Sequence, residues 1–326
     1  MPGETCTLGI LSDIHYAGSA EQARGNDYEY RDLRNPLLRI LLRLGRRFIW
    51  MRNPLGQNHL LEAFLRQAGP LDFVVANGDY SCDSGFVGLS DDAACQSARE
   101  CLALLRQRFG PNFRANLGDH ELGKLSFFGR RGGMRLASWH RATLELGLPP
   151  FWQKTLGNYV LMGLVSSLVA LPVFQADMLP EERPEWERLR AEHMAELRRA
   201  FAALQPGQRV LLFCHDPSAL PFLFREQFVQ SRLPQLEHTI VGHLHSQLVL
   251  RQSRLLAGMP PLPFLGHTAG RYTAALRNAR LWRPFHVRLC PSLAGLELLK
   301  DGGFYTVHLD CQGDRPARFH FHRLGR

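Results

Sequence analysis

Short apolar runs that end in polar residues recur along the chain and predict buried β-strands. They are Leu8–Ser12, Asp72–Asn77, Phe113–Leu117, Arg209–Cys214 and Thr239–Val241. Segments with apolar residues at helical spacing lie between several of these runs, at Leu60–Gln67, Ala93–Phe109 and Pro184–Leu204. Two runs near the carboxyl end, Gly303–Asp310 and Arg318–Arg323, alternate as edge strands do. Strands that alternate with helices predict an α/β protein with layered sheets.

One long stretch, Thr155–Ala176, carries no charged residue and has to be tested as a membrane span. Its glycines, serines and proline divide it into two apolar halves, Asn158–Met162 and Leu168–Phe174. Two buried strands joined by a tight turn fit this pattern better than a spanning helix. The first residues also lack the basic and apolar segments of a signal peptide. We therefore expect a soluble, cytoplasmic protein.

The segment 31–56 contains a basic amphipathic helix, which Asn35 and Pro36 are suited to start. Arginines gather on one side of its helical wheel, and apolar residues spread over the other. The arginines are Arg39, Arg43, Arg46 and Arg47, and the apolar residues include Leu37, Leu41, Leu44 and Phe48. Such a helix is typical of a membrane surface, and we predict membrane contact by these four apolar residues. The alternative is a helix packed on the protein body with solvated arginines.

The composition is that of a globular protein, with 326 residues of which 45% are hydrophobic and 21% charged. Disordered, collagen-like and coiled-coil classes are thereby excluded, and one domain over residues 1–326 is the simplest organisation. Lysine and arginine number 39 against 30 acidic residues, which gives a net charge of +9. A GC-rich genome or recognition of phosphate would each explain this excess. The 7 cysteines show no CxxC spacing and indicate reduced thiols.

Each of the five predicted inner strands is followed by aspartate or histidine. The motifs are Asp13-Ile14-His15, Gly78-Asp79, Gly118-Asp119-His120-Glu121, His215-Asp216 and Gly242-His243-Leu244-His245. Because α/β sheets bind ligands at the carboxyl ends of their strands, we expect these side chains to converge. Mixed carboxylate and imidazole ligands suit manganese, iron or zinc. A pair of such ions can clamp a phosphate and activate water.

The order of these motifs resembles the calcineurin-like metallophosphoesterase superfamily, with its DxH, GD, GNH[DE], H and GHxH motifs. The resemblance implies a four-layer α/β/β/α sandwich and two divalent metal ions, with manganese expected and iron or zinc as alternatives. One metal would be held by Asp13, His15 and His245, the other by Asp119, His215 and His243, with Asp79 between them. The resemblance also implies a catalytic role for His120 outside the metals, with Asp83 or Glu121 orienting it.

Asp119 departs from the pattern, because the family has asparagine at this position. Aspartate can still bind a metal, but it adds negative charge and has no N–H group to offer a phosphate oxygen. We therefore predict that Asp119→Asn raises turnover.

Two arginine-rich regions follow metal motifs and predict contact with a substrate phosphate. Arg130 and Arg131 follow the third motif, and Arg271 and Arg277 lie in the segment 268–290. The histidines outside the motifs, such as His193, are interpreted as surface or structural residues.

With the basic helix, these regions favour a phosphorylated lipid or nucleotide-lipid met on the cytoplasmic face of the inner membrane. The chain is loosely similar in this respect to the UDP-2,3-diacylglucosamine diphosphatases of lipid A synthesis, which release UMP and an acylated sugar 1-phosphate. The alternatives are a soluble phosphodiesterase or nuclease that binds nucleic acid, and a catalytically weakened scaffold. The sequence indicates no protein partner.

Overall fold

The computed structural model describes residues 5–30, 33–126, 131–262 and 267–324 of the chain. Its strands form two five-stranded sheets with the orders β10-β9-β1-β2-β3 and β4-β5-β6-β7-β8. The strands of the first sheet are β1 Thr5–Leu11, β2 Phe73–Ala76, β3 Phe113–Ala115, β9 Gly303–Asp310 and β10 Arg318–Arg323. Those of the second are β4 Phe151–Leu156, β5 Tyr159–Leu164, β6 Arg209–Cys214, β7 Leu236–Val241 and β8 Val287–Leu289.

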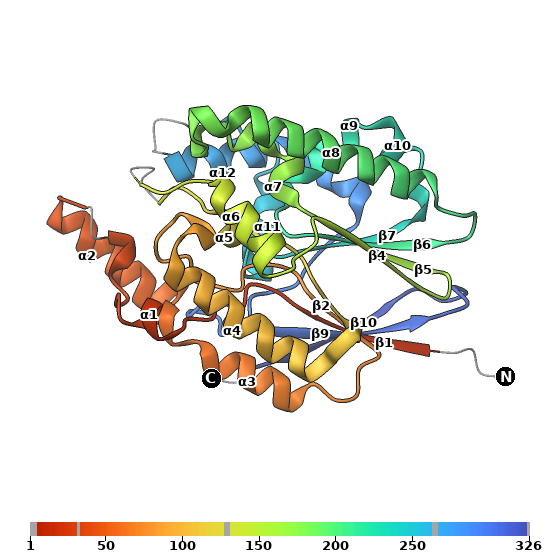
Figure 1. Ribbon diagram of the computed structural model, residues 1–326, viewed down its shortest axis with the longest axis horizontal. Helices are drawn as coiled ribbons and strands as arrows, with labels where there is room; N and C mark the ends of the chain where they lie inside the picture. Colours follow the sequence, from red (N-terminus) through yellow and green to blue (C-terminus); the bar gives the residue numbers. More distant parts are fainter. Residues whose placement is uncertain (1–4, 31–32, 127–130, 263–266, 325–326) are drawn as a thin grey trace.

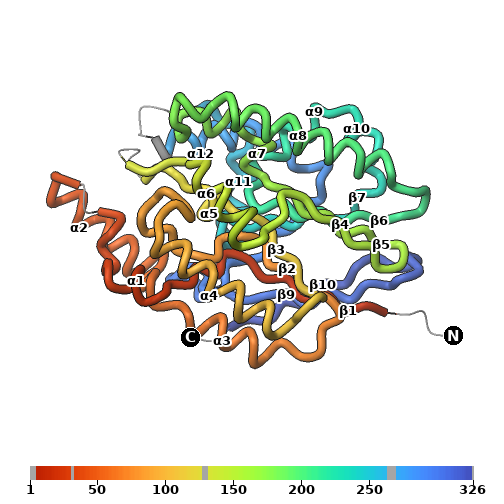
Figure 2. The backbone as a smooth tube through the Cα atoms, viewed as in Figure 1, coloured from red at the N-terminus to blue at the C-terminus, as the bar shows by residue number. Residues whose placement is uncertain are grey.

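The described ranges also contain twelve α-helices. They are α1 Ser19–Gln22, α2 Pro36–Gly45, α3 Asn58–Gln67, α4 Asp92–Phe109, α5 Asp119–Leu122, α6 Leu136–His140, α7 Ser166–Val169, α8 Arg183–Ala202, α9 Leu220–Arg225, α10 Gln227–Gln230, α11 Gln247–Leu255 and α12 His267–Asn278. In Figure 1, α3 and α4 lie below the first sheet, whereas α8, α9 and α10 lie above the second. The backbone trace shows the two sheets stacked between these helical layers (Figure 2). The predicted α/β/β/α sandwich is confirmed.

The centre of the sandwich is a buried apolar layer to which both sheets contribute, including Ile10 of β1, Val75 of β2 and Phe213 of β6. The neighbours β1, β2 and β3 run parallel, and so do β5 to β8, as buried strands joined by helical crossovers should. The outer strand β9 pairs antiparallel with β1. The carboxyl ends of the inner strands therefore meet at one edge, where the motifs begin.

The predicted strand at Leu168–Phe174 is wrong. The first half of that uncharged stretch does form β5, but its hairpin partner is the preceding β4, across a turn at Gly157 with φ +59°. Because β5 already pairs with β4 and β6, no edge is free for another strand beside it. Residues 166–173 instead form α7 and a 3₁₀ turn that begins with Leu171 and Pro172. Within the ranges described, no helix is both long and apolar enough to cross a bilayer.

Helix α2 forms where the sequence predicts it. The Asn35 side chain accepts hydrogen bonds from the backbone N–H groups of Leu37 and Leu38, at 3.0 and 3.2 Å. The helix continues as a π-helical turn, η2 (Arg46–Trp50). It lies at the left end of the molecule in Figure 1 and projects from the layered body. No residue of α2 is buried.

Candidate metal centre

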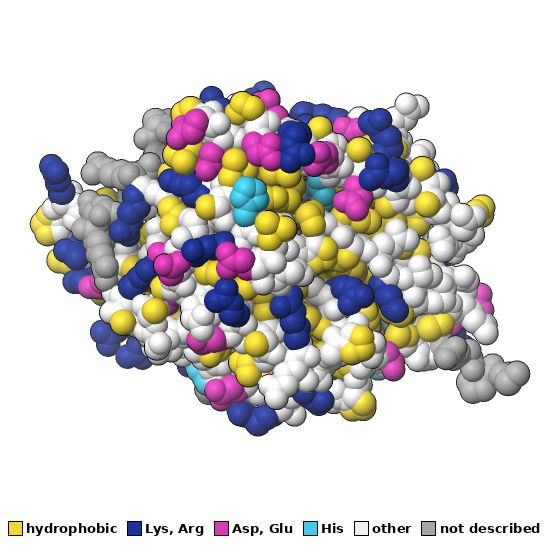
Figure 3. Space-filling model, viewed as in Figure 1, with side chains coloured by type: hydrophobic (Ala, Val, Ile, Leu, Met, Phe, Trp, Pro, Cys, Tyr) yellow, Lys and Arg dark blue, Asp and Glu magenta, His cyan; other side chains and the backbone are white. Residues whose placement is uncertain are grey.

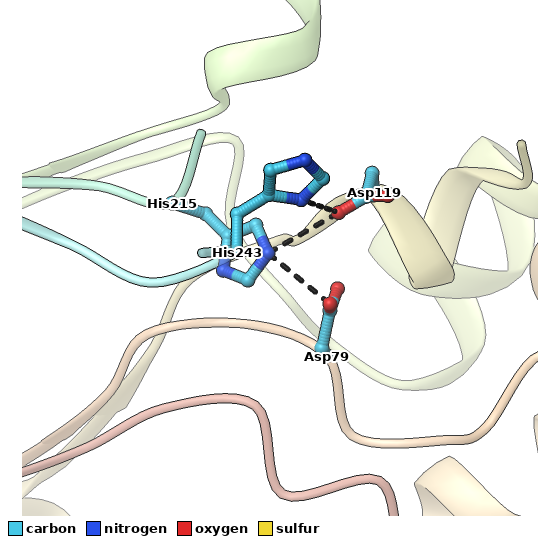
Figure 4. A group of neighbouring side chains, drawn as sticks. All are labelled: Asp79, Asp119, His215 and His243. Carbon is cyan, nitrogen blue, oxygen red and sulfur yellow. Dashed lines mark hydrogen bonds and ion pairs between the residues drawn. The ribbon is translucent and has the colours of Figure 1, made fainter. Parts of the chain in front are cut away.

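The predicted metal-motif residues converge at the shared edge of the two sheets. Two groups have ligand atoms that all lie within 4.8 Å of one another. The first group is Asp13, His15 and His245, and the second is Asp79, Asp119, His215 and His243. His120 joins His15 and Asp79 in a third, overlapping group. Figure 4 shows His215 and His243 directed toward the carboxylates of Asp79 and Asp119.

Backbone conformation, rather than simple strand alternation, aims these side chains. Five motif residues have positive φ angles between 49° and 61°, namely Asp13, His15, Asp79, His243 and His245. This left-handed conformation costs about 1–3 kcal/mol for a residue with a side chain, and such residues cluster at functional sites. The first two motifs are locked together, because Ile14 and His15 each donate an N–H hydrogen bond to the Asp79 carbonyl at 3.0 Å.

Glycine is required at two motif positions, because side-chain atoms of other residues lie where a Cβ atom would be. A Cβ atom at Gly118 would lie 2.2 Å from Asp79 Oδ1, and one at Gly242 would lie 2.1 Å from Ser12 Oγ. Neither neighbour is a flexible surface side chain, since Ser12 and Asp79 are both buried. The glycines of these motifs therefore leave the space that the carboxylates occupy.

The first group brings two imidazole nitrogens and a carboxylate oxygen close together. His15 Nε2 and His245 Nε2 are 3.4 Å apart, and His245 Nε2 lies 3.4 Å from Asp13 Oδ1. Burial lowers the pKa of His15 to about 4 and holds that of His245 well below its ordinary value. His15 Nδ1 faces the Ser81 carbonyl at 3.4 Å, an orientation that leaves the Nε2 lone pair free. A cation between them would bind both nitrogens and the Asp13 carboxylate.

The second group converges on His215 Nε2, which lies 3.2 Å from both Asp79 Oδ2 and Asp119 Oδ1. The other ring nitrogen, Nδ1, faces the Asn77 carbonyl at 2.5 Å. His243 Nδ1 lies 2.9 Å from Asp119 Oδ1. Burial alone would raise the pKa of Asp79, but His120 and His215 hold it well below its ordinary value. The two donor sets combine buried carboxylates with imidazoles, two of which, His15 and His215, are oriented by backbone carbonyls, and they fit two divalent metal ions.

Contrary to the expectation from the sequence, His120 is not oriented by Asp83 or Glu121. Its Nδ1 is buried and has no hydrogen-bond partner in the described part of the chain, so neither Asp83 nor Glu121 holds it. Asp83 Oδ1 instead accepts from the Gly88 N–H at 2.8 Å. His120 Nε2 lies 3.7 Å from Asp79 Oδ2 and is contacted by the Lys124 ammonium.

Sequence reasoning missed one residue of this centre and gave another a different role. The first is Lys124, which also pairs with Asp119 Oδ2 at 3.6 Å. The second is Glu121, whose buried carboxylate accepts three backbone N–H groups, those of Asp79, Tyr80 and Gly118, at 2.8–3.0 Å. The spacing from Gly118 to Glu121 is that of a capping box, which is the signal that could have identified Glu121.

The described members of the predicted substrate-binding arginines have the following surroundings. Arg271 pairs with the buried Asp177 at 2.5 Å and stacks over Phe174. Arg131 lies over the Phe86 ring, with its guanidinium 5.0 Å from the ring centroid. Arg277 is exposed on α12. Arg130 lies outside the described residues.

Comparison with known proteins places the chain in a family. Residues 6–247 match the sequence profile of the calcineurin-like phosphoesterases. A dimetal phosphatase from Danio rerio has the same fold, with 14% sequence identity, a TM-score of 0.50, and coverage of 97% of this chain and 95% of that chain. A purple acid phosphatase from yellow lupin seeds is 10% identical, with a TM-score of 0.40, and the match covers 74% of this chain and 38% of that chain.

No curated protein matches the chain by sequence. The family profile nevertheless spans all five motifs, from the strand before Asp13 to His245. The chain therefore belongs to the calcineurin-like phosphoesterase family and is a metal-dependent phosphoester hydrolase.

Proposed function

We propose that the substrate is a phosphorylated lipid or nucleotide-lipid presented at a membrane surface, hydrolysed at a phosphoester or pyrophosphate bond. The observation that carries this proposal is the orientation of α2. Arg43 of α2 pairs with Asp27, and Arg46 of the following turn η2 pairs with Glu29, so both arginines are directed toward the segment before the helix. This arrangement argues against the alternative in which the helix packs by its apolar side and its arginines are solvated.

The apolar side of α2 faces outward instead. Leu37 and Leu41 of α2 are 70% and 65% exposed, and Phe48 of η2 is 58% exposed. Ile40, Leu44 and Ile49 are exposed beside them. Hydrophobic and basic side chains lie together at this end of the molecule in Figure 3. Exposed apolar surface of this extent favours a lipid interface, and basic residues beside it favour anionic headgroups.

The same helix leads directly to the metal centre. The Trp50 ring lies 5.2 Å from the His245 ring, centroid to centroid. A neighbouring loop closes over the end of the helix, where the N–H groups of Glu297 and Leu298 donate to the carbonyls of Trp50 and Ile49. A lipid whose acyl chains remained in the membrane could thus present its phosphate to the site.

At the centre, two divalent ions would be held by the seven residues of the two metal groups, and they would supply activated water and charge neutralisation of the phosphate. The protein itself positions the metal ligands. Glu121 fixes the backbone of two motifs, and the turns at Asp13 and His243 aim the ligands. In this proposal His120, which lies at the margin of the groups, gives a hydrogen bond to the leaving oxygen.

Product release tests the substrate. We would incubate the protein with UDP-2,3-diacylglucosamine in detergent micelles with Mn²⁺, with an aryl phosphodiester in parallel and His120→Ala as the blank. Release of UMP by the wild-type protein and not by the blank would support the lipid proposal. Turnover of the aryl ester alone would leave the hydrolase and discard this lipid substrate.

Vesicle co-sedimentation tests whether the exposed apolar residues of α2 and η2 bind a lipid surface. We expect wild-type protein to sediment with anionic phospholipid vesicles and Leu41→Ser/Phe48→Ser to remain in solution. The matched control is Leu144→Ser, which changes a leucine that is 79% exposed outside α2 and should bind as the wild type does. Binding to DNA with a steep salt dependence would favour the nuclease instead. A dimer that the double substitution abolishes would show that a second copy of the chain covers this surface.

A further inference from the structure

The approach of a phosphate to this centre is opposed by three carboxylates. Asp13, Asp79 and Asp119 are all buried at the centre. Across the described ranges, Lys124 is the sole lysine or arginine that forms an ion pair with a motif carboxylate. Its positive charge helps to hold the pKa of Asp119 well below its ordinary value, although burial alone would raise that pKa.

The position of Lys124 is unlike that of a buried structural ion pair. Its side chain is 29% exposed, whereas that of Asp119 is 4% exposed. Its ammonium group contacts His120 Nε2, which belongs to the third, overlapping group, and Asp119 Oδ2, which belongs to the second group. It therefore lies where the two groups meet and where the centre opens to solvent.

The backbone at Lys124 is held in place independently of its side chain. The preceding Gly123 has φ +94°, a conformation that ends α5 and turns the chain. The Lys124 carbonyl then accepts from the Gly133 N–H at 3.1 Å. An ammonium group has three N–H donors, and the two contacts to His120 and Asp119 leave one of them for a further acceptor.

We propose that Lys124 binds the substrate phosphate, donating an N–H to a non-bridging oxygen and offsetting the charge of Asp119. The class of ligand is any phosphate monoester, diester or pyrophosphate that reaches the centre. The inference rests on the phosphoesterase site and is independent of whether the substrate is a lipid. Its test therefore uses small soluble ligands.

The experiment compares Lys124→Met, Lys124→Arg and wild-type protein, all loaded with Mn²⁺. We would measure the Kd of inorganic phosphate by calorimetry, the KM and kcat for an aryl phosphodiester, and the bound metal. Because a charge-assisted hydrogen bond would be lost, Lys124→Met should weaken phosphate binding by about 10- to 100-fold and raise KM, with metal content unchanged. Lys124→Arg should retain most of the affinity, and the control Lys154→Met, in β4, should match the wild type.

The pairing with Asp119 adds a second criterion. If Lys124 offsets that carboxylate, Lys124→Met should weaken phosphate binding less when Asp119 is also replaced by asparagine. An unchanged phosphate Kd in Lys124→Met would overturn the proposal. So would a loss of bound metal in that variant, because Lys124 would then maintain the ligand geometry rather than bind the substrate.

Discussion

Glu121 links the backbones of two metal motifs through a single buried carboxylate. Oε2 accepts the N–H groups of both Asp79 and Gly118, and Oε1 accepts that of Tyr80. A glutamine at this position would present one NH₂ group to N–H donors. We expect Glu121→Gln to weaken metal binding by about 10- to 100-fold. Competition for Mn²⁺ with a chelating dye would measure this loss, and Glu145→Gln, on an exposed helical turn, should bind as the wild type does.

His120 and Asp79 should respond differently to substitution. His120→Ala should retain both metal ions and lower kcat by about 10²–10⁴-fold, because it removes a proton-transfer group at the margin of the site. Asp79→Ala should lose bound metal as well as activity, because Asp79 belongs to two of the overlapping ligand groups. Elemental analysis beside turnover separates the two outcomes. Loss of metal from His120→Ala would show that His120 is itself a ligand.

The residues that the sequence could predict are those whose positions follow from a strand end. Asp13, Asp79 and His215 each come directly after a buried apolar run, so their convergence could be expected. Lys124 could not be identified in this way, because its contacts depend on the turn at Gly123. The arginine predictions rested on composition near a motif, which does not fix the direction of a side chain. Arg271, for example, is engaged by Asp177.

At the scale of elements, helix–strand ambiguity explains the error at Leu168–Phe174. Its apolar composition suits either state, and the outcome was decided by β4, which occupies the edge of β5 that such a strand would need. The existence of α2 was predictable from its cap and periodicity. The directions in which its apolar and basic sides point could not be predicted. They depend on Asp27 and Glu29, which lie before the helix and pair with Arg43 and Arg46.

The junction of α8 with the segment before α7 should make folding stability depend on pH. His193 of α8 is buried, and its Nε2 accepts the Val165 N–H at 3.2 Å. The ring proton therefore sits on Nδ1, which has no hydrogen-bond partner in the part of the chain described. Burial lowers the pKa of His193 from 6.5 to about 4. Protonation would place an unpaired charge in the core.

The direction of this pH dependence follows from proton uptake at His193. Between pH 6.5 and about 4 the unfolded chain binds a proton at His193 that the folded chain does not, so stability falls as the pH falls through this window. The contribution reaches about 3 kcal/mol. His193→Gln keeps an acceptor for Val165 and cannot titrate. Urea unfolding of both proteins at pH 7, 5.5 and 4.5 should show a difference that shrinks with acidity, and parallel curves would contradict this account.

At the scale of the molecule, the metal centre lies across the seam between the two sheets. Asp13, Asp79 and Asp119 follow strands of the first sheet, whereas His215 and His243 follow strands of the second. Direct hydrogen bonds also cross this seam, such as those from Asn116 Nδ2 to the Phe213 carbonyl at 3.1 Å and from Asn77 Nδ2 to the Ile240 carbonyl at 3.4 Å. Bound ions would therefore connect the sheets while neutralising carboxylates that repel one another.

Removal of metal should consequently destabilise the whole fold and not the site alone. An ion present at 100 times its Kd adds about 2.7 kcal/mol per site to the free energy of unfolding, so chelation should lower Tm by several degrees and added Mn²⁺ should restore it. Calorimetry of the protein with a chelator, with Mn²⁺ and with Mg²⁺ would measure the effect. In Asp79→Asn the difference between chelator and Mn²⁺ should largely disappear. If the wild-type Tm were the same with and without bound Mn²⁺, the ions would not join the sheets, and the seam would depend on the apolar layer and the direct hydrogen bonds.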